Sequence, residues 1–90
     1  MKNKTVRKIL KSFNKQHGNL HIKVNDSYCV GLERKGEDRI LIQLRDLSNS
    51  KIPTPMTVLE MLMMLNAYLD SVDVYLGEAD KFVLSVSNYR

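Results

Sequence analysis

The sequence predicts an α+β fold with the element order α-β-β-β-α-β-β, in which an antiparallel sheet carries two helices packed on one face. Three observations lead to this prediction. Apolar residues recur at helical spacing near the start of the chain and again after its middle, and they alternate with polar residues at a period of two elsewhere. Short turn-forming clusters separate these stretches, so residues 1–90 are expected to form one small domain.

The first expected element is a helix over residues 3–17. Its core-facing stripe follows the spacing i, i+3, i+4, i+7 and consists of Val6, Ile9, Leu10 and Phe13. Asn3 or Thr5 is expected to cap the start of this helix. Gly18, followed by Asn19, is expected to end it in the left-handed conformation.

Residues 20–45 are predicted to form a three-stranded meander, because three short runs alternate between apolar and polar side chains. The first turn is expected at residues 25–27, which are Asn, Asp and Ser. The register implied by this turn places Cys29 opposite Lys23, on the outer face of the sheet together with His21.

The second hairpin of the meander is expected to turn at residues 35–37. Antiparallel neighbours share a face, so the apolar residues align as Leu32 opposite Ile40 and Val30 opposite Ile42. This register also predicts two oppositely charged pairs, Glu33 with Arg39 and Arg34 with Asp38.

A loop is expected at residues 48–53, followed by a second helix over residues 54–71. Pro55 suits its first turn, and a capping box from Thr57 to Glu60 is an alternative start. The predicted core stripe of this helix consists of Val58, Met61, Leu62, Leu65, Tyr68, Leu69 and Val72. The chain is expected to finish with a hairpin over residues 73–87, turning at residues 77–80.

Positive charge is concentrated at the start of the chain. The first 25 residues contain seven lysines and arginines and no acid, in a chain of net charge +4. Five of these cations fall on the helix face opposite the apolar stripe, and we call them the basic stripe: Lys4, Arg7, Lys8, Lys11 and Lys15. The basic stripe indicates contact with phosphates or with an acidic protein, and its alternative is a solvated helix face. Association with a membrane surface is less favoured, because the apolar stripe of the same helix is needed for the core.

The element order over residues 3–71 resembles that of the double-stranded-RNA-binding domain. That family carries a lysine cluster at the start of its second helix, where it meets phosphates. The matching residues here, Thr54-Pro55-Met56-Thr57-Val58, hold no basic side chain, and the turn at residues 25–27 is short and acidic. Membership of that family is therefore not expected.

Methionine is concentrated in the second predicted helix. Met56, Met63 and Met64 fall in its outward sector, and methionine recurs on surfaces that accept partners. Together with Leu41 on the outer sheet face, these residues are predicted to bind a protein partner, with a homodimer as the expected assembly. The alternative is that the methionines belong to the core.

Catalytic and metal-binding patterns are weak. Cys29 and His21 lack a third residue to orient them as a nucleophile pair, and no metal-type spacing or phosphate-binding glycine loop is present. We therefore expect no enzymatic activity, no cofactor and no small-molecule substrate. One cysteine and no long apolar run predict a cytoplasmic protein that does not enter a membrane.

These observations favour a small binding or regulatory protein that acts by docking on a protein partner. Its size, basic start and lack of catalytic residues are typical of bacteriophage and mobile-element proteins. The alternative function is sequence-tolerant nucleic-acid binding through the basic stripe.

Overall fold

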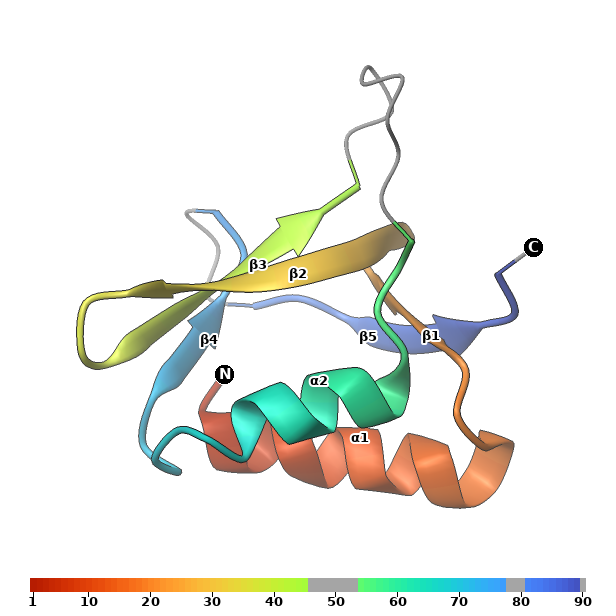
Figure 1. Cartoon of the computed structure of the whole chain (residues 1–90), viewed down its shortest axis with the longest axis horizontal. Coiled ribbons are helices and arrows are strands. Elements are labelled where there is room, and N and C mark those ends of the chain that lie inside the picture. Colours follow the sequence, from red (N-terminus) through yellow and green to blue (C-terminus); the bar gives the residue numbers. More distant parts are fainter. Residues whose placement is uncertain (46–53, 78–80, 90) are drawn as a thin grey trace.

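The computed structural model describes residues 1–45, 54–77 and 81–89, and its elements follow the predicted α-β-β-β-α-β-β order (Figure 1). The α+β class is confirmed. The helices and strands are α1 (Asn3–His17), β1 (His21–Val24), β2 (Ser27–Lys35), β3 (Arg39–Leu44), α2 (Val58–Leu65), β4 (Asp73–Tyr75) and β5 (Leu84–Ser87). Both helices lie on one side of the sheet in Figure 1, and no described helix covers the other side. None of the described helices is long and apolar enough to span a membrane.

The five strands form one mixed sheet in the order β4-β3-β2-β1-β5. β4 pairs parallel with β3, whereas the other neighbours are antiparallel. The predicted C-terminal hairpin over residues 73–87 is wrong, because β4 and β5 lie at opposite edges of the sheet. Each pairs with a different strand of the meander: β4 pairs with β3, and β5 pairs with β1. Residues 78–80, within the predicted turn, and the predicted loop at residues 48–53 lie outside the described part of the chain.

The first hairpin turns over two residues, Asn25 and Asp26, which both have positive φ angles of 47° and 68°. Such turns suit the twist of paired strands, and Asn and Asp tolerate the left-handed conformation. The resulting register pairs Lys23 with Tyr28, so the predicted three-residue turn is wrong by one residue. A one-residue shift exchanges the two faces of a strand. Cys29 is therefore buried in the core rather than exposed on the outer face.

From Leu32 onward, the second hairpin has the predicted faces but a different register. Lys35 pairs with Arg39 across residues 36–38, so neither Glu33–Arg39 nor Arg34–Asp38 forms. A slip of two residues keeps each side chain on the same face of the sheet. The alternation of apolar residues is therefore compatible with both registers. Glu33 instead forms an ion pair of 3.0 Å with Lys35, and this contact lowers the pKa of the Glu33 carboxyl.

β2 contains an irregularity between Cys29 and Gly31. It lets Cys29 on one side of the bulge and Leu32 on the other both pack against the core, although a regular strand would point them to opposite faces. Val30 is half-buried and does not belong to the core, contrary to the prediction that it lies opposite Ile42.

The first helix has the predicted bounds but not the predicted cap. Lys2 is the N-cap residue and no side chain caps the helix, so the capping roles predicted for Asn3 and Thr5 are wrong. Gly18 does have a positive φ, 81°, and its N–H donates to the carbonyl of Asn14. Its ψ of −167° is not that of a left-handed helical residue.

The second helix is shorter than predicted. It begins after Thr57, whose capping box with Glu60 is complete, so the start at Pro55 is wrong. It ends at Leu65 rather than at residue 71. The backbone then passes through turns that bring the carbonyls of Tyr68 and Leu69 to the side chain of Asn3.

The core lies between the helix pair and the inner face of the sheet. α1 contributes Val6 and Leu10, α2 contributes residues such as Met61 and Leu65, and each strand contributes at least one buried apolar side chain. One face of each helix is therefore buried in the core. The outer surface of the helices and the outer face of the sheet remain available for contacts with other molecules.

Candidate functional site

The two helices run antiparallel, so the start of α1 lies beside the end of α2 and the end of α1 lies beside the start of α2. The side-chain amide of Asn3 in the first turn of α1 donates to the carbonyl of Leu65 at the end of α2, over 2.9 Å. At the other end, the N–H of Leu59 donates to the side-chain carbonyl of Asn19, just after α1, over 2.9 Å. The outward sides of α1 and α2 therefore form one continuous surface, which we call the helix-pair surface.

Part of the basic stripe gathers around a depression in the helix-pair surface. The depression has a volume of about 280 Å³ and is lined by Lys4, Arg7, Lys8, Lys11 and Asp70. Lys15, the remaining member of the stripe, is exposed but does not line it. Four positive charges thus face one depression with a single carboxylate.

Arg7 is the most enclosed cation of this depression. Its guanidinium forms an ion pair with Asp70 and donates to the side chain of Asn66 over 3.4 Å. Its Nε is buried and has no hydrogen-bond partner among the described residues. One buried donor of Arg7 therefore remains unsatisfied by the described residues.

Two exposed apolar residues of α2, Leu59 and Met63, lie on the side of α2 nearest α1, although neither lines the depression. The side chain of Met63 is 74% exposed and that of Leu59 is 43% exposed. Leu59, Met63 and Asn66 lie about one turn apart on the same side of α2. Since Asn66 contacts Arg7, this side of α2 is the one nearest α1. Met64, exposed to 40%, faces farther round the helix.

The structure separates the four residues predicted to bind a protein partner. Met56 is buried, so its prediction as an interface residue is wrong, because the backbone of Met56 forms hydrogen bonds to Ile22 of β1 and Cys29 of β2. Leu41 is half-buried on the outer sheet face, opposite Glu33. Met63 and Met64 remain on the exposed surface of α2.

Leu69 was predicted to face the core but is 75% exposed. The helical stripe that placed it there stops at Leu65, where α2 ends. Sequence reasoning also left out Leu59, whose spacing of four residues from Met63 is the available signal for a shared helix face.

Cys29 and His21 do not form a nucleophile pair. Cys29 is fully buried, and its thiol donates to the carbonyl of Gly31 over 3.4 Å and lies 4.0 Å from the sulfur of Met56. Burial raises the pKa of this thiol to about 11. His21 points to the opposite face of the sheet, where its ring contacts Tyr89. The described residues also contain no group of three or more His, Cys, Asp or Glu side chains that could hold a metal ion.

A second cluster, missed by the sequence predictions, lies on the outer sheet face, and we call it the ring cluster. It consists of His21, Lys23, Tyr28, Arg45 and Tyr89. The Tyr89 ring meets the Tyr28 ring edge-to-face at 5.3 Å and the His21 ring at 5.5 Å. Lys23 lies 5.4 Å from the centre of the Tyr28 ring, and the Arg45 guanidinium lies 5.3 Å from that of Tyr89.

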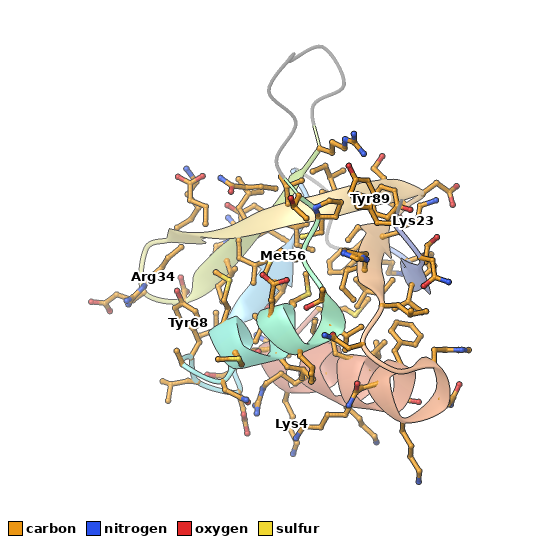
Figure 2. The ribbon with its side chains drawn as sticks, turned by 45° about the vertical axis from the view of Figure 1, so that its right-hand side comes forward. Lys4, Lys23, Arg34, Met56, Tyr68 and Tyr89 are labelled. Carbon is orange, nitrogen blue, oxygen red and sulfur yellow. The ribbon has the colours of Figure 1, made fainter. Side chains whose placement is uncertain are left out.

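The ring cluster and the basic stripe occupy different parts of the molecule. Figure 2 shows Lys23 and Tyr89 together beside β1, whereas Lys4 projects from α1 at the far side of the protein. The correct length of the first turn was the missing signal, because only a two-residue turn places Tyr28 beside Lys23 on the outer face.

Comparison of the chain with known protein families, with curated proteins and with solved structures gives no significant match. Functional inference for this protein therefore rests on its own side chains and surfaces.

Proposed function

We propose that this protein is a non-enzymatic binding protein that docks on an acidic, amphipathic segment of a partner protein through its helix-pair surface. The observation that carries the proposal is the position of Met63, exposed to 74%, on the side of α2 nearest α1, the helix whose cations line the depression. A partner helix with apolar side chains along one edge and carboxylates along the next would match both halves of this surface.

The two halves of the helix-pair surface have different energetic roles. Burying an exposed methionine side chain contributes about 1.5–3 kcal/mol, whereas an exposed ion pair contributes about 0–1 kcal/mol. Met63 and Leu59 therefore supply most of the affinity. The lysines attract and orient the acidic partner, because complementary charge acts mainly on the rate and specificity of association.

The alternative of a merely solvated basic face is less favoured by the placement of the charges. α1 has no acidic residue in its first turn, and Lys4, Arg7 and Lys8 lie in its first two turns. Cations there are opposed by the helix dipole, at about 0.3–1 kcal/mol in the least favourable positions. Helix stability does not explain such an arrangement, whereas recognition of an acidic surface does.

A direct test uses a labelled helical peptide with glutamates on one face and leucines on the next, and measures its binding by fluorescence anisotropy. We expect binding that weakens as salt rises, and that weakens about 10- to 100-fold in M63S from the lost apolar burial. K8E should also weaken binding, whereas K81E, the same change at another exposed lysine, should not. Equal binding of a peptide with serine in place of leucine would contradict the proposal.

The alternative partner for the helix-pair surface is a second copy of this chain, which would form a homodimer. Two copies meeting there would bring their basic stripes together, so such a dimer would strengthen as salt screens the repulsion. An acidic partner would show the opposite salt dependence. Sedimentation at several salt concentrations, on the parent protein and M63S, separates the two. A salt-strengthened dimer that M63S abolishes would replace the acidic partner by a second copy.

The second candidate function is sequence-tolerant duplex binding, and the four cations around one depression favour it. If these four cations contact phosphates, log K should fall with log salt at a slope near about −3.6. A labelled duplex that binds with this slope, when the acidic peptide does not bind, would select this function instead.

A further inference from the structure

We propose that the ring cluster on the outer sheet face is a binding site for single-stranded nucleic acid, with the rings stacking on bases and Arg45 and Lys23 contacting phosphates. This inference concerns a surface different from the helix-pair surface and does not depend on the function proposed there. It starts from the part of the sheet that no described helix covers.

The rings of the cluster are placed for stacking. His21, Tyr28 and Tyr89 are each half-buried, so each of these residues retains exposed surface. The ring planes of Tyr28 and Tyr89 meet at 74°, and Lys23 and Arg45 lie over these two rings, so a base would stack on a ring face that no cation covers. Bases of a single strand can occupy such faces regardless of sequence, because every base has a flat aromatic surface.

Arg45 is the member of the ring cluster whose side chain has a buried polar atom without a described hydrogen-bond partner. Its Nε is buried and has no hydrogen-bond partner among the described residues. It forms no ion pair with any described carboxylate, and its guanidinium rests on the Tyr89 ring. A buried donor without an acceptor is unfavourable. The buried Nε itself is closed to an incoming ligand, so a phosphate oxygen would be bound by the terminal nitrogens of Arg45, whose charge and geometry suit it.

Arg45 also lines a depression where such a phosphate would fit. The depression has a volume of about 210 Å³ and is lined by Asp26, Ser27, Tyr28 and Arg45. Ser27 offers a hydroxyl group, and Lys23 adds a second positive charge beside the Tyr28 ring. Asp26 opposes an anion at this position, so its carboxylate is expected to weaken binding.

The same combination recurs farther along the outer face. The guanidinium of Arg39 in β3 lies 4.0 Å from the centre of the Tyr75 ring in β4, and it too has no described ion pair. Arg39 pairs with Lys35, and Leu41 pairs with Glu33, on that face. A strand that stacks on Tyr28 and Tyr89 could thus meet another ring and cation at the opposite end of the sheet.

Single strands fit this surface better than a duplex. Bases in a duplex are stacked on each other and cannot stack on protein rings, whereas bases of a single strand can be splayed onto them. The side chains that recognise the strand come from β1, β2 and the segments after β3 and β5, so they are held by the sheet itself.

The test is fluorescence anisotropy at low salt with a labelled short oligothymidylate and with its duplex. We expect the single strand to bind more tightly. Y89A should weaken its binding roughly 5- to 100-fold through lost stacking, and Y89F should retain it, since the ring remains. R45Q should reduce the salt slope by about 0.7, and D26N should strengthen binding.

The control variant is K8Q/K11Q on α1, which should leave single-strand binding unchanged and separates this site from the helix-pair surface. Circular dichroism of each variant confirms that it is folded. The proposal is overturned if no single strand binds at low salt, or if Y89A and R45Q bind like the parent protein. It is also overturned if K8Q/K11Q alone abolishes binding.

Discussion

The side-chain amide of Asn3 and the main-chain carbonyl of Leu65 are joined by a buried hydrogen bond of 2.9 Å. The carbonyls of Tyr68 and Leu69 lie 3.2 and 3.1 Å from the same amide nitrogen, so its two hydrogens are shared among three acceptors. One residue in the first turn of α1 therefore satisfies the carbonyls at and beyond the C-terminal end of α2. This contact joins the start of α1 to the end of α2 and supports the antiparallel alignment of the two helices.

Replacing Asn3 by Ala is expected to lower the free energy of unfolding by about 1–3 kcal/mol, because buried carbonyls would lose their donor. Urea denaturation measures this loss. T5A is the matched control, since Thr5 is exposed two residues later in the same helix and caps nothing. Equal effects of N3A and T5A would contradict the role assigned to Asn3.

Replacing Thr57 by Ala should destabilise α2 at its other end. The Thr57 hydroxyl accepts from the N–H of Glu60, and the Glu60 carboxylate accepts from the N–H of Thr57. Loss of such an N-cap costs about 0.5–2 kcal/mol, which thermal denaturation can measure. Thr54 is exposed and precedes the cap, so T54A should leave the melting temperature nearly unchanged.

Met56 and Met63 provide a matched comparison of core and surface. M56A should cost about 2–5 kcal/mol, because it removes a buried side chain and leaves a cavity. M63A should change stability by no more than about 0.5 kcal/mol, because Met63 is exposed. Denaturant midpoints of the two variants give the answer. A small effect of M56A would mean that this methionine is not packed as described.

The Cys29 thiol predicts a pH dependence of stability. Burial raises its pKa from the ordinary value of 9.0 to about 11, so the folded state favours the neutral thiol. Its contribution is therefore complete below the unfolded pKa, near 9, and is lost as pH rises toward the folded pKa, near 11. The loss amounts to about 2–3 kcal/mol.

Urea unfolding across this pH window, on the parent protein and C29A, isolates the effect of Cys29 from that of other groups titrating there. C29A should lose less stability than the parent as pH rises. Identical pH profiles would show that thiol ionisation is not coupled to folding. Thiol reagents should also react far more slowly with the folded chain than with the chain in urea, because the thiolate is the reactive form.

The residues show which parts of the fold the sequence could predict. Helical spacing located α1 to the residue, and period-two alternation located the meander, because both signals depend on burial of one face. The end of α2 could not be found in this way. The carbonyl of its last residue is bonded to Asn3, which lies more than sixty residues away and which the sequence alone presents as a helix cap.

Strand register shows the same limit. The alternation in residues 20–45 specifies faces, yet the length of the first turn decides whether Tyr28 or Cys29 points outward. The pattern also allows a two-residue slip, which is why the expected pair of Glu33 with Arg39 does not form. An error in register also changes which side chains are expected to lie together in a site. The basic stripe, which needs only helical spacing, was located, whereas the ring cluster, which needs the register, was missed.

The pairing of β1 with β5 has a consequence for how the chain folds. His21 is aligned with Ser87, so β1 meets its second neighbour only after nearly the whole chain has been traversed. Closing so long a loop is entropically unfavourable, and folding slows as contacts become more distant in sequence. We expect the local β2–β3 hairpin to form first. A nascent chain that lacks β5 would expose the unpaired edge of β1 and be prone to aggregate through it.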